Sequence, residues 1–91
     1  MQFLTIKETE KIKKDLWKDD ADKAKMVVLK DEDADYVIVQ KHEEDLYSVW
    51  ITDDYTDELS GGSVADTKLD NLLSDLNMSI DMINKIKTLL G

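Results

Sequence analysis

Apolar residues recur with two different periods along the chain, and the change of period divides it into segments. Thr5 followed by Glu8 is a capping-box pattern, in which each side chain bonds the other residue's backbone N–H where a helix begins. A weak apolar stripe with helical spacing comes directly after it. We therefore predict an amphipathic helix from Ile6 to about Trp17 or Asp20.

Three runs rich in β-branched and aromatic residues follow, at positions 26–29, 36–39 and 46–52. Short turns rich in Asp and Glu separate them. Such runs with polar turns between them predict an antiparallel meander of three strands. Because the third run has apolar side chains on both of its faces, we expect helices to cover one face of the sheet and partly wrap the other.

Helical spacing returns after the Gly61-Gly62 pair, which is a flexible break. Leu and Ile then recur at helical intervals from Leu69 to Leu90. This pattern predicts either one helix over about 65–90 or two helices broken near Asn77. The whole chain, residues 1–91, is thus predicted to be a single α+β domain with the order α-β-β-β-α.

Composition narrows the class of protein. The chain has 91 residues, of which 42% are hydrophobic, enough for one core. It has no Cys, which excludes disulfides, thiolate metal sites and a cysteine nucleophile. Because small secreted domains usually need disulfides, we expect a cytoplasmic protein. No apolar run is long enough to span a membrane.

Net charge is the strongest compositional signal. Twenty-one acids oppose twelve bases, all of them Lys, and the net charge is −9. Eighteen of the acids and only five of the lysines lie within residues 19–82, between two mildly basic ends. Such a surface repels nucleic acids and anionic membranes and attracts basic proteins. The alternative is that the acidity only keeps a small protein soluble.

Catalytic equipment is not recognisable in the sequence. The single histidine, His42, stands beside an acidic turn, and no sequence pattern supplies a nucleophile to pair with it. We expect it to be a solvated turn residue. No glycine-rich phosphate loop occurs. We therefore expect no enzymatic activity and no cofactor.

One acidic segment imitates a calcium-binding loop at its start. Asp31, Asp33 and Asp35 have the spacing of the first three ligands. Tyr36 then stands where the loop needs Gly, and His42 stands where it needs a bidentate Glu. We therefore predict an acidic hairpin turn here and no metal site.

The acidic turns are the candidate functional surface. Carboxylates spaced along turns can stand in for phosphates and bind the Lys and Arg side chains that grip nucleic acid. In size, charge and α+β character the chain is similar to phage-encoded inhibitors, such as uracil-DNA glycosylase inhibitors and small acidic anti-CRISPR proteins. The resemblance implies an interaction module that occupies a basic site on a nucleic-acid-binding protein. The candidate partner-binding residues are Asp31, Glu32, Asp33, Asp35, Glu43, Glu44, Asp45, Asp53, Asp54, Asp57 and Glu58.

A second interpretation rests on residues 72–86. Leu72 and Leu76 fit a first helix, and Asn77 fits a tight turn. Ser79 fits the N-cap of a second helix, whose buried side Ile83 and Ile86 fit. This arrangement resembles the helix-turn-helix family and implies a small DNA-binding regulator.

The second helix of that interpretation would offer a surface with no Arg, made of Ile80, Asp81, Asn84, Lys85 and Thr88. DNA binding would require the lysines of both terminal helices to share one face. Those lysines are Lys7, Lys11, Lys14, Lys18, Lys85 and Lys87. The alternative for this segment is an amphipathic helix that packs on the sheet, and direct binding of nucleic acid is therefore the second choice.

A third interpretation is a structural or assembly subunit. Leu69, Leu73, Leu76, Ile80 and Ile83 have the 4-3 spacing of a short coiled-coil seam. A homodimer through the C-terminal helix would follow from it.

Overall fold

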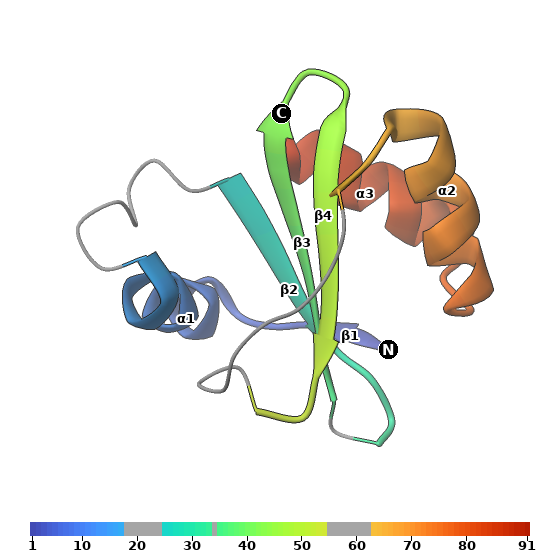
Figure 1. The fold of residues 1–91 in the computed structure, drawn as a ribbon. Helices are drawn as coiled ribbons and strands as arrows, with labels where there is room; N and C mark the ends of the chain where they lie inside the picture. Colours follow the sequence, from blue (N-terminus) through green and yellow to red (C-terminus); the bar gives the residue numbers. More distant parts are fainter. Residues whose placement is uncertain (18–24, 34, 55–62) are drawn as a thin grey trace.

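A five-stranded antiparallel sheet lies between the helices, and each strand pairs with its neighbours in the chain (Figure 1). The computed structural model describes residues 1–17, 25–33, 35–54 and 63–91. The strand order is β1-β2-β3-β4-β5. The strands are β1 (Gln2–Phe3), β2 (Lys25–Lys30), β3 (Tyr36–Glu43), β4 (Leu46–Thr52) and β5 (Ser63–Val64).

In the described ranges, three helices cover the two faces of this sheet. They are α1 (Ile6–Trp17), α2 (Asp66–Asp75) and α3 (Ile80–Leu90). Helix α1 lies on one face, and α2 and α3 lie together on the other (Figure 1). The α+β class is confirmed. Within the described ranges, none of these helices has both the length and the apolar character needed to cross a bilayer.

The predicted meander is confirmed as β2, β3 and β4, but the sheet is wider than three strands. Phe3 of β1 pairs with Leu29, and Val64 of β5 pairs with Tyr47. A two-residue strand is too short to show a period-2 pattern, and it forms because a neighbouring strand offers its backbone groups. The predicted order α-β-β-β-α holds for the long elements, and the two short strands and the break in the C-terminal helix extend it to β-α-β-β-β-β-α-α.

The predicted capping box at the start of α1 is confirmed. The Glu8 N–H donates to Thr5 Oγ1 at 3.2 Å, and the Thr5 N–H donates to Glu8 Oε1 at 3.4 Å. These bonds satisfy backbone donors that the first turn of a helix leaves without partners. The helix begins at Ile6 and ends at Trp17, as predicted.

The C-terminal segment forms two helices. Asn77 has a φ of 64°, in the left-handed region that Asn tolerates, and it ends the first helix. Ser79 caps the second helix, since its Oγ accepts the Met82 N–H at 3.2 Å. Because the break turns the second helix relative to the first, Ile80 is exposed although it continues the apolar spacing. A continuous coiled-coil seam over 69–83 is therefore wrong.

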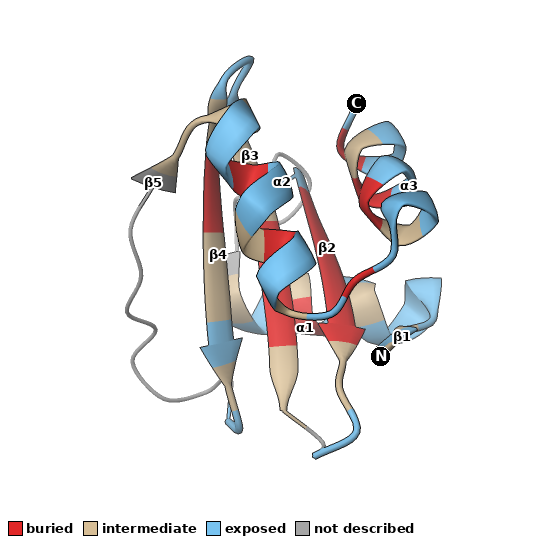
Figure 2. Cartoon of the chain, turned by 90° about the vertical axis from the view of Figure 1, so that its right-hand side faces the viewer, coloured by how far each residue is buried: buried red, intermediate tan, exposed pale blue. Residues whose placement is uncertain are grey.

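Each face of the sheet has its own core, because successive side chains of a strand point to opposite faces. The larger core lies under α2 and α3, and the smaller one lies under α1 (Figure 2). The strands contribute Val27, Leu29, Val37, Val39 and Tyr47 to the larger core, and the helices contribute Leu69, Leu73, Ile83, Ile86 and Leu90. Ile12, Met26, Val28 and Ile38 form the smaller core.

Candidate functional site

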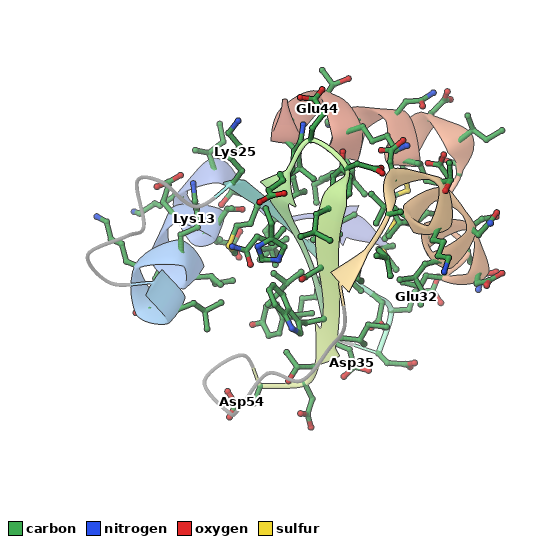
Figure 3. All side chains as sticks on the ribbon, turned by 45° about the horizontal axis from the view of Figure 1, so that its top comes forward. Lys13, Lys25, Glu32, Asp35, Glu44 and Asp54 are labelled. Carbon is green, nitrogen blue, oxygen red and sulfur yellow. The ribbon has the colours of Figure 1, made fainter. Side chains whose placement is uncertain are left out.

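The predicted acidic residues divide between the two ends of the sheet. The β3–β4 turn carries residues 43–45 at one end, while the β2–β3 turn (31–35) and residues 53 and 54 lie at the other. At the usual rise per residue, the eight residues of β3 hold these ends about 25 Å apart. Figure 3 shows Glu44 at the end opposite to Asp35 and Asp54. The nine candidates that the structure describes therefore do not form one surface.

Two separate chain segments meet at the end away from Glu44, because the pairing of Tyr36 with Thr52 brings the β2–β3 turn beside the end of β4. Asp75, at the end of α2, lines the same hollow as the acids of the turn. We call this group the acidic pole. Its members are Asp31, Glu32, Asp33, Asp35, Asp53, Asp54 and Asp75. Of the other candidates, Asp57 and Glu58 lie outside the described residues.

Asp31 builds the turn that presents this group. Its Oδ1 accepts the backbone N–H groups of Asp33 and Asp35, both at 2.9 Å. Its own N–H donates to the Asp35 carbonyl at 2.9 Å. Bonds of this kind explain why Asp favours turns. Glu32 and Asp33 are left exposed at the tip of the turn.

Electrostatic crowding at the acidic pole affects Asp35. Desolvation of its carboxyl group, and then the negative charges of Asp31, Asp53 and Asp33, raise the pKa of Asp35 above its ordinary value. These charges come from both segments of the pole. A group in such a field is stabilised by any cation brought near it.

The part of the acidic pole that comes from the β2–β3 turn and the end of α2 lines a hollow of about 380 Å³. Asp31, Glu32 and Asp75 contribute carboxylates to its wall, and Val37 and Ile51 contribute apolar surface. Ile51 is 52% exposed although its partner across the strands, Val37, is buried. Carboxylates beside apolar surface suit a Lys or Arg side chain, whose aliphatic stem and charged head need both.

Acids at the other end of the sheet are used in holding α2 and α3 to it. The Asp45 carboxylate accepts the Asp66 backbone N–H at 2.8 Å, at a helix start where Ala65 provides no side-chain cap. Lys87 of α3 pairs with Asp66 at 3.1 Å and with Asp70 at 2.8 Å. The Asp45 carboxylate therefore has a structural role at the start of α2, which makes Asp45 a weaker candidate for partner binding than Glu43 and Glu44.

This ion-pair network changes two pKa values. Burial, followed by the charge and hydrogen bond of Asp66, raises the pKa of Tyr47. Burial alone would lower the pKa of Lys87, but the hydrogen bonds and charges of Asp70 and Asp66 outweigh it, so the pKa of Lys87 is raised. The network thus links β4, α2 and α3 through charged groups.

The segment that resembles a helix-turn-helix has the expected local geometry, with a left-handed Asn77 and a Ser79 cap. Its charges differ from those of a DNA-binding surface. Lys87 is paired with two carboxylates, and Lys85 stands over the Phe3 ring, 4.6 Å from its centre. Helix α1, which carries Lys7, Lys11 and Lys14, lies on the opposite face of the sheet (Figure 1). Lys7, Lys11 and Lys14 therefore lie with α1 and Lys85 and Lys87 with α3, on opposite faces of the sheet, and Lys18 lies outside the described residues.

His42 is exposed, as the predicted solvated residue would be, but it does not lie in a turn. It lies in β3 at an irregularity of the ladder between Lys41 and Glu43, and its Nε2 is 2.6 Å from Ser48 Oγ. Ser48 is 5% exposed, so the contact satisfies a buried hydroxyl group that a substrate could not reach directly. No sequence signal connects these two residues, since their pairing depends on the strand register.

Metal ligands are not gathered in the described ranges, where no group of three or more His, Asp or Glu side chains is arranged to hold an ion. Asp31, Asp33 and Asp35 form the predicted acidic turn between β2 and β3.

Comparison with known proteins identifies no relative. No protein-family model matches the chain, and neither a curated protein nor a solved structure is significantly similar to it.

Proposed function

We propose that this protein is an acidic interaction module whose acidic pole occupies a basic, nucleic-acid-binding site on a partner protein. The observation that carries the proposal is the convergence of acids from three segments. Acids of the β2–β3 turn and of the end of α2 line one hollow, and the charge of Asp53, at the end of β4, acts on Asp35 of that turn. The protein would act as an inhibitor, because a site filled with its carboxylates is closed to phosphates.

The arrangement of charge supports this proposal better than the net charge alone. Acids spread evenly over a surface would keep the protein soluble without crowding one another. Here the charges of Asp31, Asp53 and Asp33 contribute to the raised pKa of Asp35. Carboxylates that crowd one another in the free protein gain more from an incoming cation than isolated ones do.

Apolar surface within the pole supports a protein partner over a simple counterion. Ile51 is exposed beside the carboxylates of the hollow. A protein segment with Lys or Arg could cover Ile51 with an aliphatic stem while its charged head reaches Glu32 or Asp33. A metal ion or a free polyvalent cation would gain nothing from that apolar contact.

A pull-down from nuclease-treated cell lysate tests the proposal, with retained proteins identified by mass spectrometry. We expect one or more basic nucleic-acid-binding proteins, released as the salt concentration rises. A double-stranded DNA oligonucleotide added in excess should displace them, because it competes for the same basic site.

Two variants with the same change of net charge make the test specific. Glu32→Lys with Asp33→Lys reverses two exposed acids of the pole, and Glu43→Lys with Glu44→Lys reverses two exposed acids at the opposite end. We expect the first variant to lose the partner and the second to keep it. Equal loss in both variants would contradict a site at the acidic pole and indicate an effect of net charge.

Direct DNA binding through α2 and α3 is the alternative that the same experiment detects. The local geometry of Asn77 and Ser79 favours it. If lysate without nuclease treatment yields only DNA, the inhibitor proposal fails. Lys85→Ala should then weaken that binding.

A further inference from the structure

Among the described residues, the first half of β2 has no strand beside it on one side and is an edge of the sheet. β1 pairs with β2 only at Lys30 and Leu29, and the chain then leaves the sheet after the Leu4 N–H donates to the Val28 carbonyl at 3.1 Å. In the part of the chain that the structure describes, no strand lies beside residues 25–27 on that side.

The direction of the backbone groups follows from the ladder. In an antiparallel sheet, the N–H and C=O of every second residue point to the same side of the strand. Because the Val28 carbonyl points towards β1, the N–H and C=O of Met26 point to that side too, beyond the end of β1. Such groups at a sheet edge are a template for another strand.

An apolar hollow adjoins this edge. It has a volume of about 380 Å³, and residues of β1, α1, β2 and α3 line it. Two large apolar side chains at its margin are exposed, Ile6 of α1 to 83% and Leu89 of α3 to 59%. An open strand edge with apolar surface above and below is the arrangement that binds extended peptides by strand addition.

Lysines surround the edge, in contrast to the acidic character of the whole chain. Lys25 begins β2, and Lys13 and Lys85 line the hollow from α1 and α3. Figure 3 shows Lys13 and Lys25 on the same side of the molecule. Glu10 is the one acid among the lining residues, and it pairs with Lys13 at 3.6 Å. An incoming segment with negative charge is therefore favoured here.

We propose that an extended segment of a partner protein, in which acidic and apolar side chains alternate, binds here as an added strand beside residues 25–28 of β2. Its backbone pairs with Met26, its apolar side chains contact Ile6 on the face of α1, and its carboxylates, on the other face, reach Lys25 and Lys85. A second copy of this chain fits less well, because two-fold pairing at Met26 would bring the lysines of both copies together. This site has the opposite charge to the acidic pole and is independent of it.

The test is an NMR titration of the isotope-labelled protein with the capped peptide acetyl-Glu-Val-Glu-Val-Glu-Val-amide. Salt near 0.15 M limits the long-range repulsion from the acidic surface to about 8 Å. We expect the amide signals of Met26 and Val28 to shift, with an affinity about 10-fold higher than that of the same peptide with Lys in place of Glu. Equal binding of both peptides, or no shift at residues 25–28, would overturn the proposal.

Two controls separate strand addition from simple charge attraction. The double variant Lys25→Glu, Lys85→Glu should reverse the preference between the two peptides, which also shows that it remains folded. Methylation of the alternate peptide nitrogens that face β2 should abolish binding, because those nitrogens no longer donate hydrogen bonds. A methylated peptide that binds as well as the parent would contradict strand addition. A mass of the free protein that rises with concentration, and that the double variant keeps at the monomer value, would contradict the proposed partner segment and indicate a second copy of this chain instead.

Discussion

Acidic side chains at the two ends of the sheet have different surroundings, although both ends carry Asp and Glu. Near the β3–β4 turn, Asp45 binds the first N–H of α2, and Lys87 pairs with Asp66 and Asp70. At the acidic pole, desolvation and then the negative charges of carboxylates from separate segments raise the pKa of Asp35. The position of a charge relative to its neighbours, and not the total of −9, therefore separates carboxylates that hold the fold together from those that we propose for a basic partner.

Removing Lys87 should have the largest effect on stability, because it leaves Asp66 and Asp70 facing each other. We expect Lys87→Met to lower the free energy of unfolding by about 1–2 kcal/mol at neutral pH, measured by urea denaturation. Since the pKa of Lys87 is raised in the folded state, its contribution is complete below pH 10.5 and is lost as the pH rises through the higher folded value.

The exposed Lys68 of α2 is the matched control for that variant. Lys68→Met should change the free energy of unfolding by no more than about 0.5 kcal/mol, as surface substitutions usually do. Equal losses from both substitutions would mean that the ion pairs of Lys87 contribute nothing specific.

Replacing Asp45 should lower the free energy of unfolding less than replacing Lys87 does, by about as much as the loss of a helix cap. Asp45→Ala removes the acceptor for the Asp66 N–H, and we expect a loss of about 1 kcal/mol in the free energy of unfolding. Asp45→Asn should lose less, because its amide oxygen can still accept that hydrogen bond. If Asn and Ala cost the same, charge and not the hydrogen bond is the stabilising factor.

Replacing Asp35 should stabilise the protein, in contrast to replacing Lys87 or Asp45. Its raised pKa means that the folded protein binds the proton more tightly than the unfolded chain, so the ionised carboxylate opposes folding above its pKa. We expect Asp35→Asn to raise Tm at pH 7. The gain should shrink as the pH falls through the folded pKa and disappear below the ordinary value of 3.8. A variant with a lower Tm at pH 7 would contradict the crowding at the pole.

Local signals predicted much of the fold. The Thr5–Glu8 capping box and the Ser79 cap each bond backbone groups within one turn of helix, so their residues suffice to identify them. The three long strands show in their β-branched runs. β1 and β5 could not be found in this way, because two residues form a strand only when a neighbour pairs with them.

The sequence predicted which acids are candidates but not which of them meet. Asp75 joins the pole only because α2 ends beside the β2–β3 turn, and no spacing in the sequence connects it to Asp31. Lys87 looked available for DNA, yet the packing of α3 on α2 pairs it with two carboxylates. Ser48 meets His42 through strand register. Contacts between distant segments depend on tertiary packing, which local patterns do not specify.

The most direct test of the acidic pole is an NMR titration with a capped hexalysine peptide, a cationic probe that requires no identified partner. We expect the amide signals that shift most to be those of residues 31–35, 53, 54 and 75, and Glu32→Lys with Asp33→Lys to remove these shifts. Glu43→Lys with Glu44→Lys should leave them in place. Shifts of equal size around residues 43–45, lost to the same extent in both variants, would show that the probe follows net charge and would contradict a binding site at the pole.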